Sequence, residues 1–327
     1  MMLLALATAA LLLADPMVPP AYGSYRGWAY PSYPSCPGCP KVRNASCTAC
    51  EGAIVSEYLY PKGTVNFAPN GEAFWDPDVT LVGWAYCWNS PWVSKANGSV
   101  LNVTEVEQYF EHQATPPLAS TGILGPGLDE CLLGNENVRG EKEAAAAGFR
   151  NSKKKNPNGF RAAWGSQAGD EVFASLMVDG TFDLAMVEAY TYCPGCGGWP
   201  NGSTCCTTAQ WTNPDPTKWI ADYTPRLDYA RANGYLNRTI FCFGTGMQGK
   251  SAINPHGWTI AIMRTLFMLL KKNYPELAGV SMYGGSPGFG WNGTAWGMQI
   301  DPAADNATLT LIHDISMLMV EFYPDPK

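Results

Sequence analysis

The segment Phe182-Asp-Leu-Ala-Met-Val-Glu-Ala-Tyr-Thr-Tyr192 carries the clearest strand signal in this 327-residue chain and decides its fold. It is apolar and aromatic and follows a Gly180-Thr181 turn, a pattern typical of a buried β-strand. Successive side chains of a strand point to opposite faces. One face therefore carries Leu184, Met186, Glu188, Tyr190 and Tyr192. The other carries small residues that can lie under helices, namely Ala185, Val187 and Ala189. Taken alone, the segment is equally compatible with a strand whose last polar residues meet solvent.

Strands and helices alternate along most of the chain. The predicted strands are residues 53–60, 79–88, 121–130, 160–166, 182–192, 239–243 and 278–283. The predicted helices are residues 103–113, 136–156, 170–180, 215–233, 254–273 and 305–322, with caps at Asn102 and Asp170 and a break or kink at Pro225. Such alternation predicts parallel strands joined by right-handed crossovers.

The fold class that we predict is α/β, a (β/α)₈ TIM-like barrel with one strand degenerate in the irregular N-terminal half. An open doubly wound sheet is the alternative. We prefer the barrel because polar and aromatic residues recur at the C-terminal ends of most strands. The predicted organisation is a signal peptide at residues 1–14, a Pro/Tyr-rich and Cys-rich extension at 15–52, and one barrel domain at 53–327.

Several features predict a secreted, extracellular glycoprotein. Residues 1–13 form an apolar run of signal-peptide length, too short to span a bilayer, so no stable membrane insertion is expected. Seven Asn-x-Ser/Thr sequons are present, at Asn44, Asn97, Asn102, Asn201, Asn237, Asn292 and Asn306. Of the 11 cysteines, eight form two tight clusters that favour disulfides over a zinc site in an oxidising compartment. The clusters are Cys36, Cys39, Cys47 and Cys50, and Cys193, Cys196, Cys205 and Cys206. Because the total is odd, at least one cysteine must be free or paired with another chain.

The charge pattern argues against nucleic-acid and metal partners. The net charge is −7, and no basic stretch is long enough to bind nucleic acid. The run Lys153-Lys154-Lys155 ends a predicted helix, where it is expected to complement the helix dipole in solvent. The three histidines do not cluster at metal-ligand spacing, so no metal or other cofactor is expected. The oligomeric state is left open.

Two short motifs match nucleotide and hydrolase patterns but lack the context that each chemistry needs. Gly244-Thr-Gly-Met-Gln-Gly249-Lys250-Ser251 fits a P-loop, but no helix begins at its Lys-Ser, and the strand at 278–283 offers no aspartate for magnesium. Gly284-Gly-Ser286-Pro-Gly288 fits a nucleophile elbow, but Pro287 has no N–H to donate to an oxyanion. We interpret both as loops at strand ends.

Carboxylates at two strand ends are the strongest catalytic candidates. Strand 121–130 ends in Asp129 and Glu130, and Glu188 lies two strands further along. Two carboxylates facing each other across a cleft are the minimal equipment for glycoside hydrolysis. We predict Glu130 as general acid with Asp129 as the fallback, Glu188 as the second carboxylate, and Tyr190 as the residue that orients or stabilises charge near Glu188.

Aromatic residues near the predicted strand ends suit a sugar substrate, because flat rings with polar edges complement the apolar faces of sugars. Any single tryptophan is more often a core or loop anchor, whereas a set at one rim indicates a binding surface. The predicted carbohydrate-contacting residues are Trp84, Trp88, Trp164, Tyr192, Tyr283 and Trp291.

The order of elements from residue 121 to residue 283 resembles the C-terminal half of a glycoside-hydrolase TIM barrel, distantly that of the chitinase-like family 18 enzymes. Counting back from 278–283 as the eighth strand places Asp129 and Glu130 on the fourth and Glu188 on the sixth. The resemblance implies the barrel fold and cleavage of a poly- or oligosaccharide by carboxylate chemistry. The chain departs from the family at Gly127-Leu128-Asp129-Glu130, where Leu128 stands in place of the assisting aspartate. A non-catalytic carbohydrate-binding or cell-surface glycoprotein on a degenerate barrel is the alternative.

Overall fold

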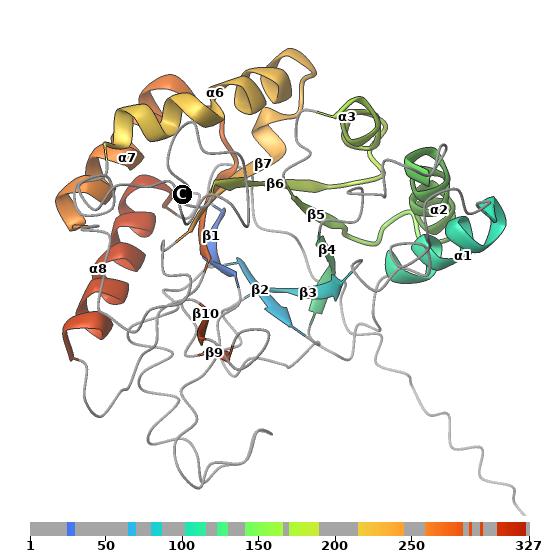
Figure 1. Ribbon diagram of the computed structural model, residues 1–327, viewed down its shortest axis with the longest axis horizontal. Coiled ribbons are helices and arrows are strands. Elements are labelled where there is room, and N and C mark those ends of the chain that lie inside the picture. Colours follow the sequence, from blue (N-terminus) through green and yellow to red (C-terminus); the bar gives the residue numbers. More distant parts are fainter. Residues whose placement is uncertain are drawn as a thin grey trace, which may run out of the picture.

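Eight parallel strands form the centre of the molecule (Figure 1). The computed structural model describes residues 25–29, 65–69, 80–86, 102–115, 123–129, 141–165, 170–189, 215–244, 259–283, 288–289, 295–296 and 306–324. The strands are β1 (Tyr25–Ala29), β2 (Val65–Pro69), β3 (Thr80–Tyr86), β4 (Ile123–Asp129), β5 (Ala162–Gly165), β6 (Leu184–Ala189), β7 (Thr239–Gly244) and β8 (Gly279–Tyr283). Each strand pairs with the next, and β8 pairs with β1 over five residues, so the sheet closes on itself. The predicted α/β class with parallel strands and covering helices is confirmed.

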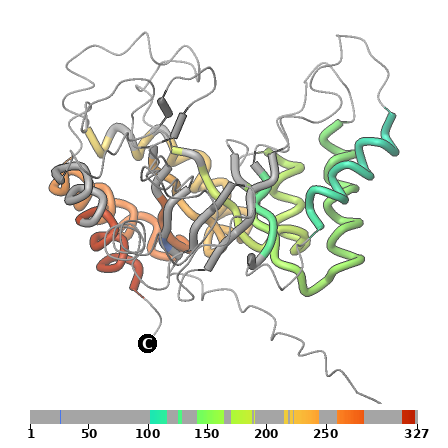
Figure 2. Tube along the Cα trace, turned by 90° about the horizontal axis from the view of Figure 1, so that it is seen from below, coloured from blue at the N-terminus to red at the C-terminus, as the bar shows by residue number. Residues whose placement is uncertain are grey.

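Helices surround the strands. They are α1 (Val103–Gln113), α2 (Glu141–Lys155), α3 (Glu171–Val178), α6 (Pro216–Ala232), the short 3₁₀ helix η5 (Leu236–Arg238), α7 (Ile260–Asn273) and α8 (Asn306–Phe322). A two-stranded antiparallel pair, β9 (Gly288–Phe289) and β10 (Ala295–Trp296), follows β8. Figures 1 and 2 both place α1 and α2 on one side of the molecule and α7 and α8 on the other. No helix in the described part of the chain is both long and apolar enough to cross a bilayer.

The main core lies between the strands and the helices. On β6 the outward residues Ala185, Val187 and Ala189 are buried in the same apolar cluster as helix residues, as the two-residue alternation predicts. Chains of aromatic contacts extend through this layer. One joins α1, α2, the start of β6 and α3 through Phe110, Phe149, Phe182 and Phe173. The other joins α6, β7, α7 and α8 through Tyr223, Phe241, Phe243, Phe267 and Phe322.

Local capping signals fix several helix ends. The side chain of Asn102 accepts a hydrogen bond from the Glu105 amide at 3.4 Å, and Asp170 accepts from the Val172 and Phe173 amides at 2.9 and 3.2 Å. Gly180 follows α3 with a φ of 75°, a conformation that favours glycine. The predicted caps at Asn102 and Asp170 are therefore confirmed.

The N-terminal part of the barrel differs from the prediction. The sequence interpretation treated the stretch before residue 35 as a linker, yet it contains β1, which pairs with β8 from Tyr25↔Gly279 to Ala29↔Tyr283. The barrel therefore begins within the predicted extension of residues 15–52. The stretch after residue 60, predicted as a connection, contains β2. The predicted strand at residues 53–60 lies outside the described residues.

Helix boundaries also differ in places. The helix predicted to start at residue 254 begins at Ile260, because the Thr259 hydroxyl caps it by accepting from the Ile262 amide at 3.2 Å. Of the break or kink predicted at Pro225, the break is excluded, since α6 continues through this residue. Proline has no backbone N–H, so the Ala221 carbonyl lacks its usual helical donor at residue 225. Both residues are exposed, so water can donate to this carbonyl instead.

The lysine run at the end of α2 is more specifically bound than predicted. Lys153 donates to both carboxylate oxygens of Asp183, at 3.2 and 3.3 Å, and Lys155 pairs with Glu111 of α1. Lys154, the third lysine of the run, is exposed and forms no such ion pair with another described residue. These pairs fasten the end of α2 to α1 and to the start of β6.

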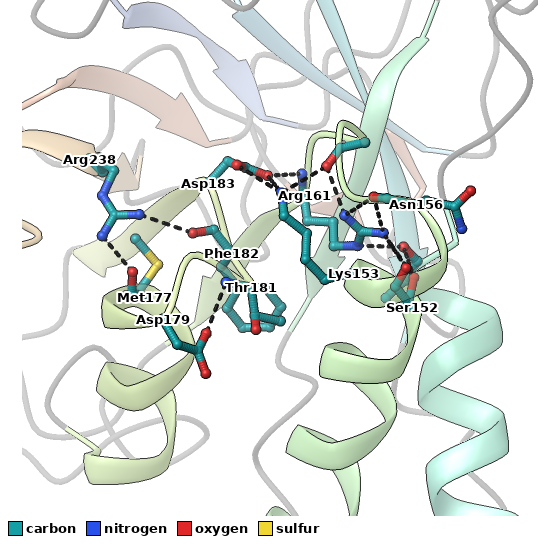
Figure 3. Close-up of polar contacts among 12 residues, drawn as sticks. Ser152, Lys153, Asn156, Arg161, Met177, Asp179, Thr181, Phe182, Asp183 and Arg238 are labelled. Carbon is teal, nitrogen blue, oxygen red and sulfur yellow. Dashed lines mark hydrogen bonds and ion pairs between the residues drawn. The ribbon is translucent and has the colours of Figure 1, made fainter.

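Arg161 organises the face of the barrel at the N-terminal ends of the strands (Figure 3). Its side chain is 0% exposed and donates to backbone carbonyls at the C-terminal ends of two helices. The partners are Ala114 O at 3.0 Å, Ser152 O at 2.9 Å, Gly159 O at 2.7 Å and Asn156 O at 3.3 Å. Burial lowers the pKa of the guanidinium, and the nearby Asp183 carboxylate opposes that shift. Arg161 thereby adds charged donors to carbonyls at the C-terminal ends of α1 and α2, where Ala114 O also accepts from the Ser152 hydroxyl and Ser152 O from the Asn156 amide.

Cys242 of β7 is a buried thiol with 0% exposure. The other ten of the 11 cysteines lie outside the described residues.

Gly148 permits the close approach of α2 to α1. A Cβ at this position would lie 2.4 Å from the Glu107 carbonyl oxygen and 3.0 Å from the Glu111 nitrogen, both backbone atoms of α1. We expect Gly148→Ala to lower the free energy of unfolding by about 1–3 kcal/mol through overpacking, measured by urea denaturation. Helix propensity alone predicts the opposite sign, a gain of about 1 kcal/mol.

The neighbouring Ala147→Gly variant is the matched control. It measures the free-energy difference between alanine and glycine at a half-buried position of the same helix. It should lower stability by about 1 kcal/mol. A higher urea midpoint for Gly148→Ala than for wild type would contradict the close approach of the two helices.

Candidate active site

The C-terminal ends of the parallel strands meet at one rim, where barrel enzymes place their chemistry. Asp129 is the last residue of β4, and Glu188 is the last but one of β6, with β5 between them. Asp129 is in register with Trp164, and Trp164 with Met186, so Glu188 lies two residues further towards the rim. Neighbouring strands are about 4.8 Å apart, which puts the backbones of β4 and β6 about 10 Å from each other.

Buried side chains lie in the barrel interior near the level of Glu188. The Ser281 hydroxyl of β8 donates to the Met186 sulfur of β6 at 3.6 Å, and both side chains are buried. β7 lies between β6 and β8, so two side chains that meet across it lie inside the ring of strands. The next residues along these strands, Val187 and Val280, belong to the outer core beneath the helices. Cys242 is in register with Glu188 on one side and with Ser281 on the other. The described interior side chains near this level, Met186, Cys242 and Ser281, are therefore small or sulfur-containing.

The structure describes part of the predicted site. Asp129, Glu188, Trp84, Trp164 and Tyr283 all lie in barrel strands. Trp164 is the register neighbour of Asp129, and Trp84 is in register with Gly127, two residues earlier on β4. Tyr283 ends β8, in register with Ala29 and Gly244. The remaining predicted site residues lie outside the described residues: Glu130, Tyr190, Trp88, Tyr192 and Trp291.

Three of the predicted glycosylation sites lie in the described residues. Asn102 and Asn237 have exposed side chains, and Asn306 is the first residue of α8. The other four, Asn44, Asn97, Asn201 and Asn292, lie outside the described residues.

Sequence reasoning missed the residues beneath the candidate site. Cys242 follows the outward-facing Phe241 on β7, and Ser281 follows the outward-facing Val280 on β8. Both strands were correctly predicted. The alternation of polar and apolar residues along β7 and β8 is the sequence signal that identifies these two positions. Within the described ranges, no three His, Cys, Asp or Glu residues come close enough together to hold a metal ion.

No protein-family model matches the sequence, and no curated protein sequence matches it. Solved structures do match the fold. The endoglucanase Cel5A of Pseudomonas stutzeri has a TM-score of 0.50 and 14% identity, covering 91% of this chain and 96% of that one. The glycoside hydrolase domain of PelA from Pseudomonas aeruginosa has a TM-score of 0.44 and 14% identity, covering 80% and 95%. Active domain 2 of the thermostable chitinase from Pyrococcus furiosus has a TM-score of 0.45 and 8% identity, covering 93% and 95%.

At these identities the likeness concerns the fold, and the match to the endoglucanase carries it, because that TM-score reaches 0.50. This match confirms, at the level of the fold, the distant resemblance to a glycoside-hydrolase TIM barrel that the order of strands predicts.

Proposed function

We propose that this protein is a secreted glycoside hydrolase that cleaves a poly- or oligosaccharide with carboxylates from β4 and β6. The observation that carries the proposal is the placement of Asp129 and Glu188 at the C-terminal ends of two parallel strands separated only by β5. Two carboxylates across a cleft provide the acid and the nucleophile or base of glycoside hydrolysis.

The buried residues on the helix-facing side of β4 and β6 support the placement of the two carboxylates on the interior face of the barrel. Leu128 on β4 and Val187 and Ala189 on β6 are buried in the core beneath the helices. Because strand residues alternate between faces, the positions of Asp129 and Glu188 fall on the interior face of the barrel.

Each residue has a distinct proposed role. Glu130 is the general acid that protonates the leaving oxygen, with Asp129 as the fallback, and Glu188 is the second carboxylate. Tyr190 orients Glu188 or stabilises the charge that develops near it. Carboxyl groups about 5 Å apart would retain the anomeric configuration, and a separation of roughly 6.5–9.5 Å would invert it. Trp84, Trp164 and Tyr283, with Trp88, Tyr192 and Trp291, provide ring faces for sugars.

The same proposal assigns the protein to the extracellular space. The apolar N-terminal run is the length of a signal-peptide core, the seven sequons are glycan acceptors, and the ten cysteines other than Cys242 can all pair as disulfides. Carbohydrate is the proposed partner.

The test is a screen of the purified protein against polysaccharides that covers α- and β-linked glucans, chitin, mannans and uronic-acid polymers. We expect release of reducing ends from at least one of them. The Glu130→Gln/Glu188→Gln double variant, purified in parallel, should release none. Binding of a polysaccharide without cleavage would instead support the non-catalytic carbohydrate-binding protein. Cleavage that persists in the double variant would contradict the assigned residues.

A further inference from the structure

The sequon Asn237-Arg238-Thr239 is built into the barrel, although its asparagine faces solvent. Asn237 is exposed in η5, but Thr239 is the first residue of β7 and is 0% exposed. The Thr239 hydroxyl, the group that makes the triplet an acceptor sequence, donates to the Tyr235 carbonyl at 3.0 Å. In the folded protein this hydroxyl is therefore engaged and inaccessible.

The backbone of the same triplet is also fixed. The Arg238 amide donates to Tyr235 O at 2.9 Å, and the Ala278 amide donates to Thr239 O at 2.9 Å. The Arg238 guanidinium donates to the carbonyls of Phe182, at 3.3 Å, and of Met177 (Figure 3). An enzyme that must take hold of all three residues would have to open η5 and separate β7 from its neighbours.

The sequon Asn102-Val103-Thr104 is the opposite case. All three residues are exposed, and they occupy the cap and first turn of α1. The cap hydrogen bond from the Glu105 amide to Asn102 is long, at 3.4 Å, and the Val106 amide donates to Asn102 O at 3.2 Å. A helix end frays at a cost close to zero, whereas a core strand opens only at a cost that approaches the global stability.

We propose that Asn237 receives an N-linked glycan only before β7 is sealed into the barrel, whereas Asn102 remains an acceptor in the folded protein. This inference rests on the secretory route proposed above. Ala278, whose amide binds Thr239 O, lies 278 − 239 = 39 residues downstream. At roughly 5–20 residues per second, synthesis of that interval takes about 2–8 s, which gives the transferase an interval in which the triplet is open.

The position of the glycan is compatible with the proposed activity. Asn237 precedes the N-terminal end of β7, whereas Asp129 and Glu188 lie at the C-terminal ends of their strands. A glycan at Asn237 therefore projects from the face opposite the candidate active site.

The experiment compares the two sequons within one chain. Full-length protein is secreted from cells treated with tunicamycin, so that it folds without glycans, and is offered to purified oligosaccharyltransferase with a lipid-linked donor. A second sample is reduced and carboxymethylated in denaturant before transfer, which modifies Cys242 and prevents the barrel from re-forming. Peptide mass spectrometry gives the occupancy of each site, and Asn237→Gln confirms the peptide assignment.

The folded sample should be modified at Asn102, with occupancy at Asn237 at least about tenfold below that of the unfolded sample, because exposing Thr239 requires opening of a core strand. Comparable transfer to Asn237 in both samples would overturn the proposal, as would absence of transfer to Asn237 in the unfolded chain. Equal protection of both sequons in the folded sample would also contradict it. A failure of the secretory route alone gives a different result, namely no glycan at either site in untreated cells.

Discussion

Glu188→Gln should lower kcat by about 10³-fold, within the 10²- to 10⁴-fold range that a positioned acid or base contributes, with little change in KM. A loss of that size corresponds to about 4 kcal/mol of transition-state stabilisation. The amide keeps the shape of the side chain but can neither attack a sugar nor accept a proton. The rates of wild type and variant are compared on the polysaccharide that the screen identifies, and thermal unfolding confirms that both are folded.

Two further variants separate the candidates on β4. Glu130→Gln should lose activity to a similar extent, and Asp129→Asn should lose much less if Glu130 is the acid. The reverse order would transfer the role to Asp129. Glu143→Gln is the matched control, because Glu143 is an exposed glutamate on α2, and it should leave the rate unchanged. Full activity in both Glu130→Gln and Glu188→Gln would exclude the proposed acid pair.

Arg161→Met should lower the free energy of unfolding by about 3–5 kcal/mol, the range typical of breaking a buried charged network. Methionine fills much of the aliphatic volume but cannot donate hydrogen bonds. The carbonyls of Ala114, Ser152 and Gly159 would lose the donors that now lie 2.7–3.0 Å away. Each of these carbonyls keeps a second donor: the Ser152 hydroxyl for Ala114 O, the Asn156 amide for Ser152 O and the Lys153 ammonium for Gly159 O. The loss therefore consists of several hydrogen bonds to a charged group, each worth about 1.5–3 kcal/mol. Urea denaturation measures the difference in the free energy of unfolding, provided that this free energy falls with urea concentration at the same slope in both proteins.

Arg231→Met is the control for loss of an arginine near a helix end. Arg231 donates to Glu276 at 2.5 Å and to Asn273 O at 2.6 Å, but its side chain is 41% exposed. Water replaces the lost contacts there, so the cost should be at most about 1 kcal/mol. Similar losses for the two variants would mean that burial of the Arg161 network adds nothing to stability.

The parts of the fold that were predicted correctly rest on local signals. The caps at Asn102 and Asp170, the positive-φ turn at Gly180 and the alternation of β6 are each encoded within a few residues. The same alternation located Glu188 near the end of its strand. Predictions from such signals need no knowledge of the rest of the chain.

The parts that were missed depend on distant residues. β1 carries a charged residue at its second position and shows no apolar alternation, and Arg26 is tolerated there because its guanidinium donates to Tyr323 O at 2.8 Å. β2 contains both an asparagine and a proline within five residues, which argues locally against a strand. The register of Asp129 with Trp164, and of Glu188 with Cys242, follows from the stagger of the whole ring. No short segment of sequence specifies that stagger.

β1, the first described strand, is stabilised by residues that come more than 250 positions later in the sequence, because it pairs with β8 from Tyr25↔Gly279 to Ala29↔Tyr283. Arg26 and Tyr323 are 297 residues apart, and α8, which ends at Phe322, delivers the carbonyl that Arg26 binds. Chains dominated by such non-local contacts fold slowly, because the entropy of closing a long loop is lost before the contacts form. A nascent chain that lacks α8 cannot complete this contact. Until β8 has been synthesised, β1 cannot complete its pairing, and an unpaired strand edge is open to association with other chains.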